Sequence, residues 1–406
     1  MYSLLSNCQI IDVKSGKIRS EKYIVIKDSK IFKILEDRPQ TSDITEIDVG
    51  GKFVLPGFID AHVHVNAIAA NLNNLRFQPA TYVVPQAIKI MKEMLLRGFT
   101  TVRDAAGADW GIARAVEEGY IISPRIIFGG QALSSTGGHG DSRSEGDYSG
   151  PYPRGSELSI LCNGVSEVRK ACRDLIRTGA HHIKIMASGG VASPTDRIDS
   201  LQFSEDEIRA IVEEANNANI YVLAHTYTAK AVNRAIKLGV RSIEHANLLD
   251  EESISLFKEY DAFLVPTLVT YYALKEEGME LGLPPESYRK IDSVLETGKR
   301  AIRMAYEGGV KMAYGTDLLG DMQRRQLEEF ALLYEIMPPL DSLKTATINS
   351  AQLLKMEDKI GDILEGGYAD LLVYSENPLR KFDILQNPEQ NLLLIMKDGQ
   401  IYKNII

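Results

Sequence analysis

The middle of the chain alternates short apolar runs with helical patterns, and this alternation constrains the fold more than any other feature. Such a rhythm predicts βα units whose strands lie in a parallel sheet. Eight runs over roughly 290 residues match a TIM (β/α)₈ barrel in count and length. A doubly wound open sheet is the alternative, but no Gly-x-Gly-x-x-Gly turn opens the first unit. The runs span 58–64, 100–104, 125–129, 182–186, 221–225, 242–245, 262–267 and 312–317.

Helix signals lie between most of these runs. Ser204 followed by Glu207 predicts a capping box at the start of a helix over 204–217. A second helix is expected over 228–238, where Gly239 supplies the stop signal. Both helices fall between consecutive runs, as the βα rhythm requires.

The two ends of the chain alternate apolar and polar residues in short runs, which indicates antiparallel strands. Because both ends are rich in such runs, we expect them to pair with each other. The expected fold class is therefore α/β: a TIM (β/α)₈ barrel with a small β-sandwich domain formed by the N- and C-terminal segments. The expected boundaries are 1–55 and 356–406 for the sandwich, and 56–355 for the barrel.

Composition and charge exclude several classes of partner. The chain of 406 residues has a formal net charge of −9 and no basic stripe, which argues against nucleic acid. Its start lacks a signal-peptide pattern, and no apolar run is long enough to span a bilayer. The three cysteines, Cys8, Cys162 and Cys172, form no Cys-x-x-Cys pair, which fits a reducing compartment. We expect a cytoplasmic protein with no membrane partner.

Metal-capable side chains end several of the apolar runs. His62 and His64 lie two apart on one strand, so both imidazoles point the same way. His225, His245 and Asp317 end later strands, and the active site of a barrel lies at the carboxyl ends of its strands. A lone histidine is more often a core residue, but four of the seven histidines fall at these ends. Imidazole and carboxylate are good zinc ligands, so a metal site is expected there.

Lys184 lies inside the fourth predicted strand, among isoleucine and methionine. Burying a lysine in such a strand costs free energy unless another group uses it. One interpretation is a lysine that reaches solvent or pairs with an acid. The other is a functional amine, because burial beside cations lowers the pKa of an ammonium group.

The ordered set of His62, His64, Lys184, His225, His245 and Asp317 resembles the amidohydrolase superfamily, in its binuclear subtype with a carboxylated lysine. The segments at 54–64 and 366–373 resemble the flanks of that superfamily. The imidazolonepropionase-related branch, with Xaa-Pro dipeptidases (prolidases) and related metallo-carboxypeptidases, is the most similar part of it. The stretches that carry this closer resemblance are 134–141, 183–196, 221–228, 242–248 and 265–271.

The resemblance implies two divalent metal ions, expected to be zinc. His62, His64 and Asp317 would hold one metal, and His225 and His245 the other. N6-carboxylated Lys184 and a hydroxide would bridge them. It further implies that the hydroxide attacks an amide carbon and that Asp317 passes a proton to the leaving nitrogen. The expected substrate is an Xaa-Pro dipeptide.

Three more residues are candidate substrate contacts. His139, in a glycine-rich loop, is expected to bind the carbonyl oxygen or carboxylate of the substrate, with a solvated loop residue as the alternative. Tyr227 is a candidate hydroxyl donor, or an aromatic packing residue. Arg143 is a candidate partner for an α-carboxylate, or a solvent-exposed side chain. We expect His181 and His182 to be structural.

Several functions remain open at this level. A carboxypeptidase or N-acyl-amino-acid amidase that prefers a basic or aromatic C-terminal residue differs only in its pocket. A deaminase or cyclic-amide hydrolase of the same superfamily is disfavoured by Lys184, and a non-catalytic scaffold by the complete ligand set. Any partner is expected to be a small-molecule substrate, either a dipeptide or an N-acyl amino acid, and the chain a homo-oligomer. A preference for basic residues would require an unpaired acid in the pocket, with Asp196, Asp199 and Asp321 as candidates.

Overall fold

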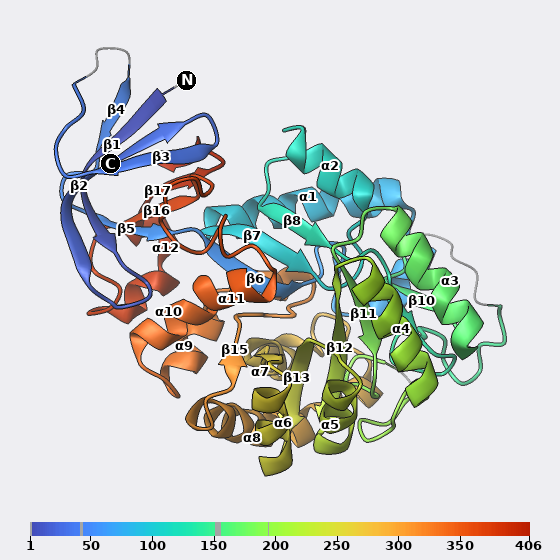
Figure 1. The fold of residues 1–406 in the computed structure, drawn as a ribbon. Helices are drawn as coiled ribbons and strands as arrows, with labels where there is room; N and C mark the ends of the chain where they lie inside the picture. Colours follow the sequence, from blue (N-terminus) through green and yellow to red (C-terminus); the bar gives the residue numbers. More distant parts are fainter. Residues whose placement is uncertain (1, 41–43, 151–155, 194) are drawn as a thin grey trace.

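The two ends of the chain meet in a sheet beside a larger α/β part (Figure 1). The computed structural model describes residues 2–40, 44–150, 156–193 and 195–406. The terminal sheet has eight strands, and its hydrogen-bonded path runs β18-β17-β16-β5-β1-β2-β3, with β4 paired to β1. These strands are β1 Tyr2–Ile11, β2 Ile18–Lys27, β3 Lys30–Leu35, β4 Thr45–Asp48, β5 Phe53–Pro56, β16 Leu371–Tyr374, β17 Leu392–Lys397 and β18 Gln400–Asn404.

The expected pairing of the chain ends takes place between β5 and β16, which run antiparallel with Leu55 opposite Leu372. Consecutive residues of these strands are fully buried, and Val54 and Val373 pack in one core with Leu5 and Met396. Burial of this apolar surface holds the terminal segments together. All eight strands belong to one continuous hydrogen-bonded sheet.

The α/β part is built on parallel strands in two sheets. One sheet has the order β6-β7-β8 and the other the order β10-β9-β11-β12-β13-β14-β15. Their bounds are β6 Phe58–Val63, β7 Phe99–Asp104, β8 Arg125–Phe128, β9 Ala132–Ser134, β10 Ser159–Leu161, β11 His182–Met186, β12 Tyr221–Thr228, β13 Ser242–Leu248, β14 Phe263–Val265 and β15 Lys311–Met312.

Backbone hydrogen bonds connect the three-stranded sheet to the seven-stranded one on both sides. The N–H of His181 donates to the carbonyl of Phe128 at 2.9 Å, beside β8 and β11. On the opposite side, the N–H of Ala61 donates to the carbonyl of Tyr314 at 2.7 Å, beside β6 and β15. The eight expected runs therefore follow one another in space in the order of the sequence.

The last of the eight runs departs from the expected strand. Only Lys311–Met312 pairs as β15, and the chain then crosses toward β6. A β-carbon at Gly315 would lie 2.9 Å from the β-carbon of His62 and 2.3 Å from a methyl of Val265, so this crossing requires glycine. The crossing brings Asp317 next to β6.

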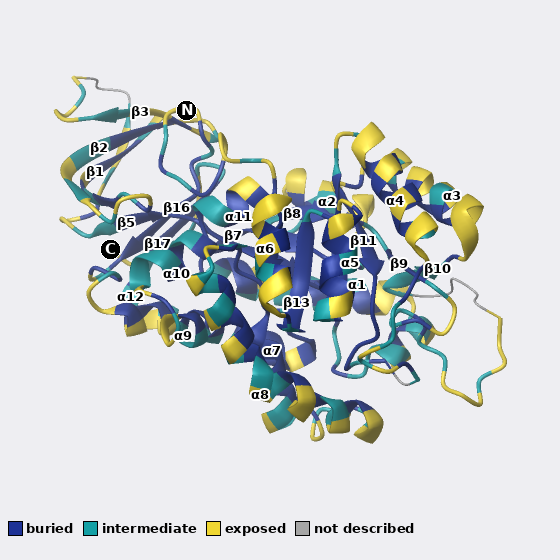
Figure 2. Cartoon of the chain, turned by 60° about the horizontal axis from the view of Figure 1, so that its bottom comes forward, coloured by how far each residue is buried: buried dark blue, intermediate teal, exposed yellow. Residues whose placement is uncertain are grey.

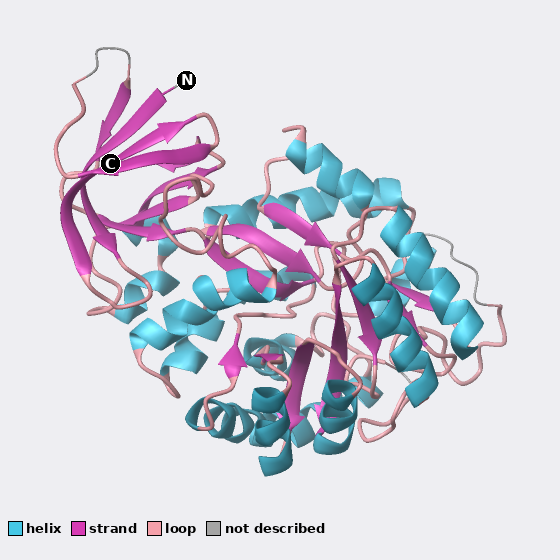
Figure 3. Ribbon diagram, in the orientation of Figure 1, coloured by secondary structure: helices cyan, strands magenta, loops and turns pink. Residues whose placement is uncertain are grey.

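Helices lie outside the parallel strands (Figure 3), and their inward faces are buried while their outer faces are exposed (Figure 2). The predicted capping box of Ser204 and Glu207 is present at the start of α4, and Thr228 caps α5. Among the described residues, no helix is long and apolar enough to cross a membrane. The helices are α1 Ala80–Leu96, α2 Trp110–Glu117, α3 Gly164–Arg177, α4 Glu205–Asn217, α5 Ala229–Lys237, α6 Glu251–Glu259, α7 Leu268–Glu277, α8 Pro285–Glu307, α9 Glu328–Tyr334, α10 Pro339–Thr345, α11 Ile348–Leu353 and α12 Pro388–Asn391, with 3₁₀ turns η1 Leu72–Phe77, η2 Gly320–Arg325 and η3 Phe382–Gln386.

Candidate active site

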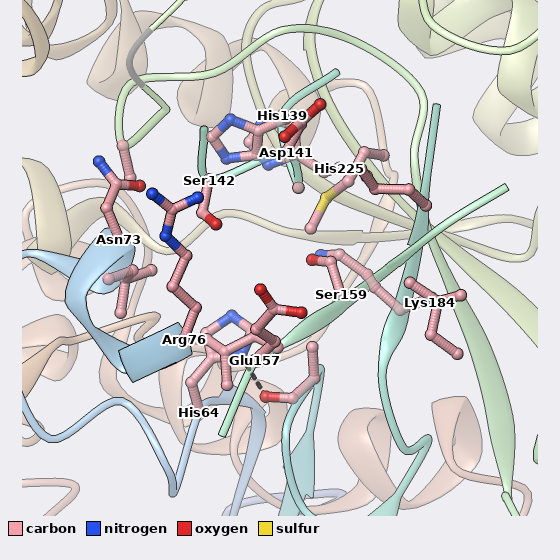
Figure 4. Close-up of a pocket in the computed structure, with 18 of the residues that line it drawn as sticks. His64, Asn73, Arg76, His139, Asp141, Ser142, Glu157, Ser159, Lys184 and His225 are labelled. Atoms are coloured by element: carbon pink, nitrogen blue, oxygen red, sulfur yellow. Dashed lines mark hydrogen bonds between the residues drawn. The ribbon is translucent and has the colours of Figure 1, made fainter. Parts of the chain in front are cut away.

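A cavity of about 520 Å³ collects the metal-capable side chains of the parallel strands (Figure 4). Its volume lies in the range of small-molecule sites. All six side chains of the expected ligand set line this cavity: His62, His64, Lys184, His225, His245 and Asp317. Residues that are up to 255 positions apart in the sequence, from His62 to Asp317, therefore line the same cavity.

Three of these residues form a compact group. One ligand atom each from His62, His64 and Asp317 lies within 4.8 Å of the others. The Asp317 carboxylate is 3.5 Å from Nε2 of His62 and 3.3 Å from Nε2 of His64. Asp317 adopts a left-handed φ of +51°, and its N–H donates to the carbonyl of His62 at 2.8 Å. A left-handed non-glycine residue is strained, and such strain is concentrated at functional sites.

The second ring nitrogens of three histidines are held by protein groups. Nδ1 of His64 donates to the carbonyl of Ala106 at 2.8 Å. Nδ1 of His245 is 2.7 Å from Oγ1 of Thr267, and Nδ1 of His62 is 2.5 Å from Glu244. These contacts orient the rings and leave Nε2 free, as metal-ligating histidines require.

Burial favours the neutral form of His62, His225 and His245, which is the form that ligates a metal, whereas the Asp317 carboxylate raises the pKa of His64. Burial lowers the pKa of His245 to about 3, and the pKa values of His62 and His225 fall well below the usual range for the same reason. Burial alone would raise the pKa of Asp317, but the neighbouring His62 and His64 lower it below its usual value. The donor set therefore combines neutral imidazoles with an ionised carboxylate, which fits a divalent cation such as zinc.

His225 and His245 line the cavity next to this three-residue group. Their ring centroids are 4.6 Å apart, and the ring of His245 is 5.1 Å from that of His62. Nε2 of His225 is 3.2 Å from the carbonyl of Gly189, so an N–H donated there leaves Nδ1 with a free lone pair. His245 has a left-handed φ of +70°. The two rings can thus supply a second pair of nitrogen ligands next to the first group.

Lys184 is buried on β11 with 2% of its surface exposed. Within the described residues, no group accepts a hydrogen bond from its ammonium, although Glu244 and Asp317 lie close enough to favour the charged form. Burial outweighs both carboxylates and lowers the pKa of Lys184 to about 8. A substantial fraction of the amine is therefore uncharged, and nucleophilic, near neutral pH.

A buried ion pair that was not expected from the sequence lies next to the candidate ligand His62. Nη2 of Arg103, on β7, donates to both carboxylate oxygens of Glu244 at 3.0 and 2.9 Å, and both side chains are inaccessible to solvent. Glu244 also accepts from Oγ of Ser242 at 2.5 Å and contacts Nδ1 of His62. The sequence held one signal of this pair: Arg103 and Glu244 are charged residues inside the apolar runs 100–104 and 242–245.

Replacing Glu244 by glutamine is expected to weaken zinc binding about 10- to 100-fold, because His62 loses its carboxylate partner. It is also expected to lower the free energy of unfolding by about 3–5 kcal/mol, because the charge of Arg103 remains buried without a partner. Zinc titration and urea unfolding measure the two effects. Glu252→Gln, which removes an exposed partner of Lys237, is the matched control and should change neither. Unaltered zinc affinity in Glu244→Gln would contradict this role.

The candidate substrate contacts occupy different positions. His139 lines the cavity, and its ring stacks on that of His225 at 4.1 Å. Its Nδ1 lies 2.8 Å from Oγ of Ser193. A β-carbon at Gly190 would lie 2.2 Å from the His139 ring, so glycine is required for this packing.

Arg143 also lines the cavity, but its guanidinium is already paired. Nε and Nη2 donate to the two carboxylate oxygens of Asp141 at 2.8 and 2.7 Å. Tyr227 is buried and is absent from the lining; its hydroxyl accepts from Tyr271 at 3.0 Å and its ring stacks on His245 at 5.4 Å. Tyr227 therefore contacts the candidate ligand His245 without lining the cavity itself.

The histidines before Lys184 and the three candidate acids lie away from the cavity wall. Nε2 of His182 is 3.1 Å from the carbonyl of Asp104, and Nδ1 of His181 is 3.2 Å from that of Phe128. None of the three candidate acids lines the cavity; instead Glu157, which sequence reasoning missed, does. Asp196 lies 3.5 Å from Nζ of Lys290, Asp199 pairs with Arg197, and Asp321 is exposed.

Known proteins with similar sequences and structures are hydrolases. The Amidohydrolase family matches residues 53–402. The ochratoxinase of Aspergillus niger is 34% identical over 364 residues, which cover 86% of this chain and 75% of that protein. The crystal structure of a prolidase complexed with N-methylphosphonate-L-proline is similar over 100% of both chains, with 43% identity and a TM-score of 0.98. That of an Xaa-Pro dipeptidase with methionine bound in its active site is 30% identical, with a TM-score of 0.89 over 100% of both chains.

The matched region contains every side chain of the expected ligand set. It also includes β16, which pairs the C-terminal segment with β5 of the N-terminal one. The similarity therefore covers the cavity and the frame around it. The chain belongs to the amidohydrolase family and is a hydrolase that acts on carbon–nitrogen bonds.

Proposed function

We propose that this chain is a binuclear zinc dipeptidase that cleaves Xaa-Pro dipeptides. The observation that carries the proposal is the convergence of six ligand-capable side chains on one cavity, with ligand atoms of His62, His64 and Asp317 within 4.8 Å of one another. The choice of substrate is supported by 43% identity, over the whole chain, to a prolidase complexed with N-methylphosphonate-L-proline.

In this proposal, His62, His64 and Asp317 would hold one metal, while His225 and His245 would hold the other. Carboxylated Lys184 would be a ligand as well, and its lowered pKa supports that modification because only the neutral amine reacts with carbon dioxide. When bound, the ions supply Lewis-acid polarisation of the substrate carbonyl and lower the pKa of water.

Asp317 is the group that moves the proton. Its carboxylate accepts a proton from the attacking water, whose oxygen forms a bond to the amide carbon. The C–N bond then breaks and Asp317 delivers the proton to the leaving nitrogen, which is a secondary amine in an Xaa-Pro substrate. A lowered pKa keeps Asp317 ionised and ready to accept that proton.

The proposal also assigns roles to the other candidate residues. His139 contacts the carbonyl oxygen or carboxylate of the substrate, supported by its position in the lining beside His225. Arg143 is the proposed partner of the substrate carboxylate, and a direct contact would require its guanidinium to leave Asp141. Tyr227 supports His245 through ring stacking, and a direct catalytic contact would require its hydroxyl to leave Tyr271.

We further propose that the parallel strands form a closed (β/α)₈ barrel over 56–355, with a β-sandwich formed by 1–55 and 356–406. The hydrogen bonds that connect β6 to the segment after β15, and β8 to the segment before β11, support closure. The shared core of the terminal strands supports the sandwich.

A second candidate function is the hydrolysis of other N-acyl amino acids or of peptides with other C-terminal residues. The similarity to ochratoxinase and the apolar side chains of Leu72, Phe77 and Leu161 in the cavity lining favour it. Such side chains would accept an acyl group larger than that of a dipeptide.

Metal content and a substrate panel together test the proposal. We expect about two zinc ions per chain after loading with zinc and bicarbonate, and turnover of Xaa-Pro dipeptides. The panel includes Xaa-Arg and Xaa-Phe dipeptides and N-acyl amino acids. Turnover of these substrates but not of Xaa-Pro dipeptides would support the second candidate function. Protein that binds no zinc and hydrolyses no substrate of the panel would refute the hydrolase mechanism.

A further inference from the structure

One carboxylate in the cavity has no partner among the residues that the structure describes. Glu157 lines the cavity just before β10, and Figure 4 shows its carboxylate pointing inward beside Arg76. Across residues 2–40, 44–150, 156–193 and 195–406, that carboxylate has no hydrogen-bond or ion-pair partner. Arg76 itself forms an ion pair with Asp147.

The backbone around Glu157 is held firmly. The Glu157 carbonyl accepts from Nε2 of Gln131 at 3.0 Å, and the carbonyl of Leu158 accepts from the N–H of Ala132 at 2.8 Å. Ser159 then pairs in parallel with Ala132. The backbone that carries Glu157 is therefore fixed at the cavity wall by β9 and β10.

Partial burial without a cationic partner costs free energy. Burial raises the pKa of Glu157, and the nearby charge of Arg76 opposes that shift only in part. A half-buried carboxylate is stabilised when a cation or hydrogen-bond donor binds it. Arg143, another charged side chain of the lining, already has a partner in Asp141.

We propose that Glu157 binds a protonated amine on the acyl side of the substrate and thereby determines specificity. This inference rests on the proposed dipeptidase function. An Xaa-Pro dipeptide carries an α-ammonium group two bonds from the scissile carbonyl, close to the expected metal cations. An anionic side chain nearby offsets the repulsion between those charges. The amine has two possible sources: the α-ammonium group, or the side-chain ammonium of an N-terminal lysine.

Two pairs of substrates separate these sources. Alanyl-proline and propionyl-proline differ only in the α-ammonium group. 6-Aminohexanoyl-proline and hexanoyl-proline differ only in a terminal ammonium group. The ratio of kcat/KM within each pair measures recognition of that charge, because the rest of the substrate is the same in both members.

We expect Glu157→Gln to lower one of these ratios about 10- to 100-fold, as the loss of a charge-assisted hydrogen bond predicts. A fall in the first ratio shows that Glu157 binds the α-ammonium group, and a fall in the second shows that it binds the side-chain ammonium group. Glu157→Ala should lower the same ratio. That result shows that the effect comes from loss of the carboxylate and not from the side-chain amide of the glutamine variant. The control is Glu145→Gln, which removes an exposed carboxylate outside the cavity lining and should leave both ratios unchanged.

The outcomes separate this inference from the proposed function. If metal-loaded wild-type protein hydrolyses none of the four proline amides, the dipeptidase proposal is wrong and the inference fails with it. If wild type is active and both Glu157 variants bind zinc normally but keep both wild-type ratios, the inference alone is wrong. A fall in either ratio supports it.

Discussion

Replacing Lys184 by alanine is expected to reduce kcat/KM at least about 1000-fold, because the proposed carboxylated lysine would be a ligand to both metals. The same change should lower zinc content toward zero or one ion per chain. Zinc analysis and turnover of an Xaa-Pro dipeptide measure both effects. Lys299→Ala, which removes a surface ion pair with Glu335, is the matched control and should leave both unchanged.

Chemical rescue distinguishes a carboxylated lysine from an ordinary one. Alanine at position 184 leaves a space that a short carboxylic acid such as propionate can fill, and its carboxylate would replace the carbamate. We expect propionate to restore zinc binding and part of the activity, whereas an alkylamine of similar size should not. Rescue by the amine alone would show that Lys184 acts as a free ammonium group.

The pH dependence of metal loading follows from the same residue. The pKa of Lys184 is about 8 in the folded protein, so the amine is mostly protonated below that pH and mostly neutral above it. Only the neutral amine reacts with carbon dioxide. Metal-free protein given zinc at a fixed concentration of dissolved carbon dioxide should therefore regain activity faster at pH 8.5 than at pH 6.5. Equal rates at both pH values would contradict this assignment.

Asp317→Asn is expected to reduce kcat about 100- to 10,000-fold, the range for loss of a group that transfers a proton. Asparagine keeps the shape and one oxygen of aspartate but accepts no proton. The limb of the pH–rate profile that protonation of this carboxylate causes lies below the usual carboxylate range, because His62 and His64 lower its pKa, and this limb should be absent from the variant. Steady-state kinetics across pH measures both effects, and zinc content shows how much of the loss comes from weaker metal binding.

A nearby exposed residue provides the control for Asp317. Asp321, at the start of η2, is four residues away and lies outside the cavity lining. Asp321→Asn removes the same charge and should change neither the rate nor the pH profile. If Asp317→Asn keeps wild-type kcat with a full complement of zinc, another group must move the proton.

The ligand set was predictable from the sequence because its signal is local. Side chains repeat every two residues along a strand, so His62 and His64 had to share a face. The carboxyl ends of parallel strands meet on one side of the sheet, so His225 and His245 had to approach them. The cavity lining contains all of these residues.

The last strand was only partly predictable. The run that ends at Asp317 was expected to be a strand throughout, yet only Lys311–Met312 pairs. The remainder crosses to β6 because Gly315 permits close contact with His62. That contact involves residues about 250 positions apart, a separation over which local pattern carries no information.

The sequence by itself determined the βα rhythm, the pairing of the two chain ends and the residues that converge on the cavity. The tertiary structure decided which charged groups are already neutralised: Arg143 is paired with Asp141, Arg103 with Glu244, and Glu157 with none of the described residues. The physical reason is that strand periodicity is a property of neighbouring residues. The pairing of a buried charge depends instead on the partners that folding brings within about 4 Å, whatever their separation along the chain.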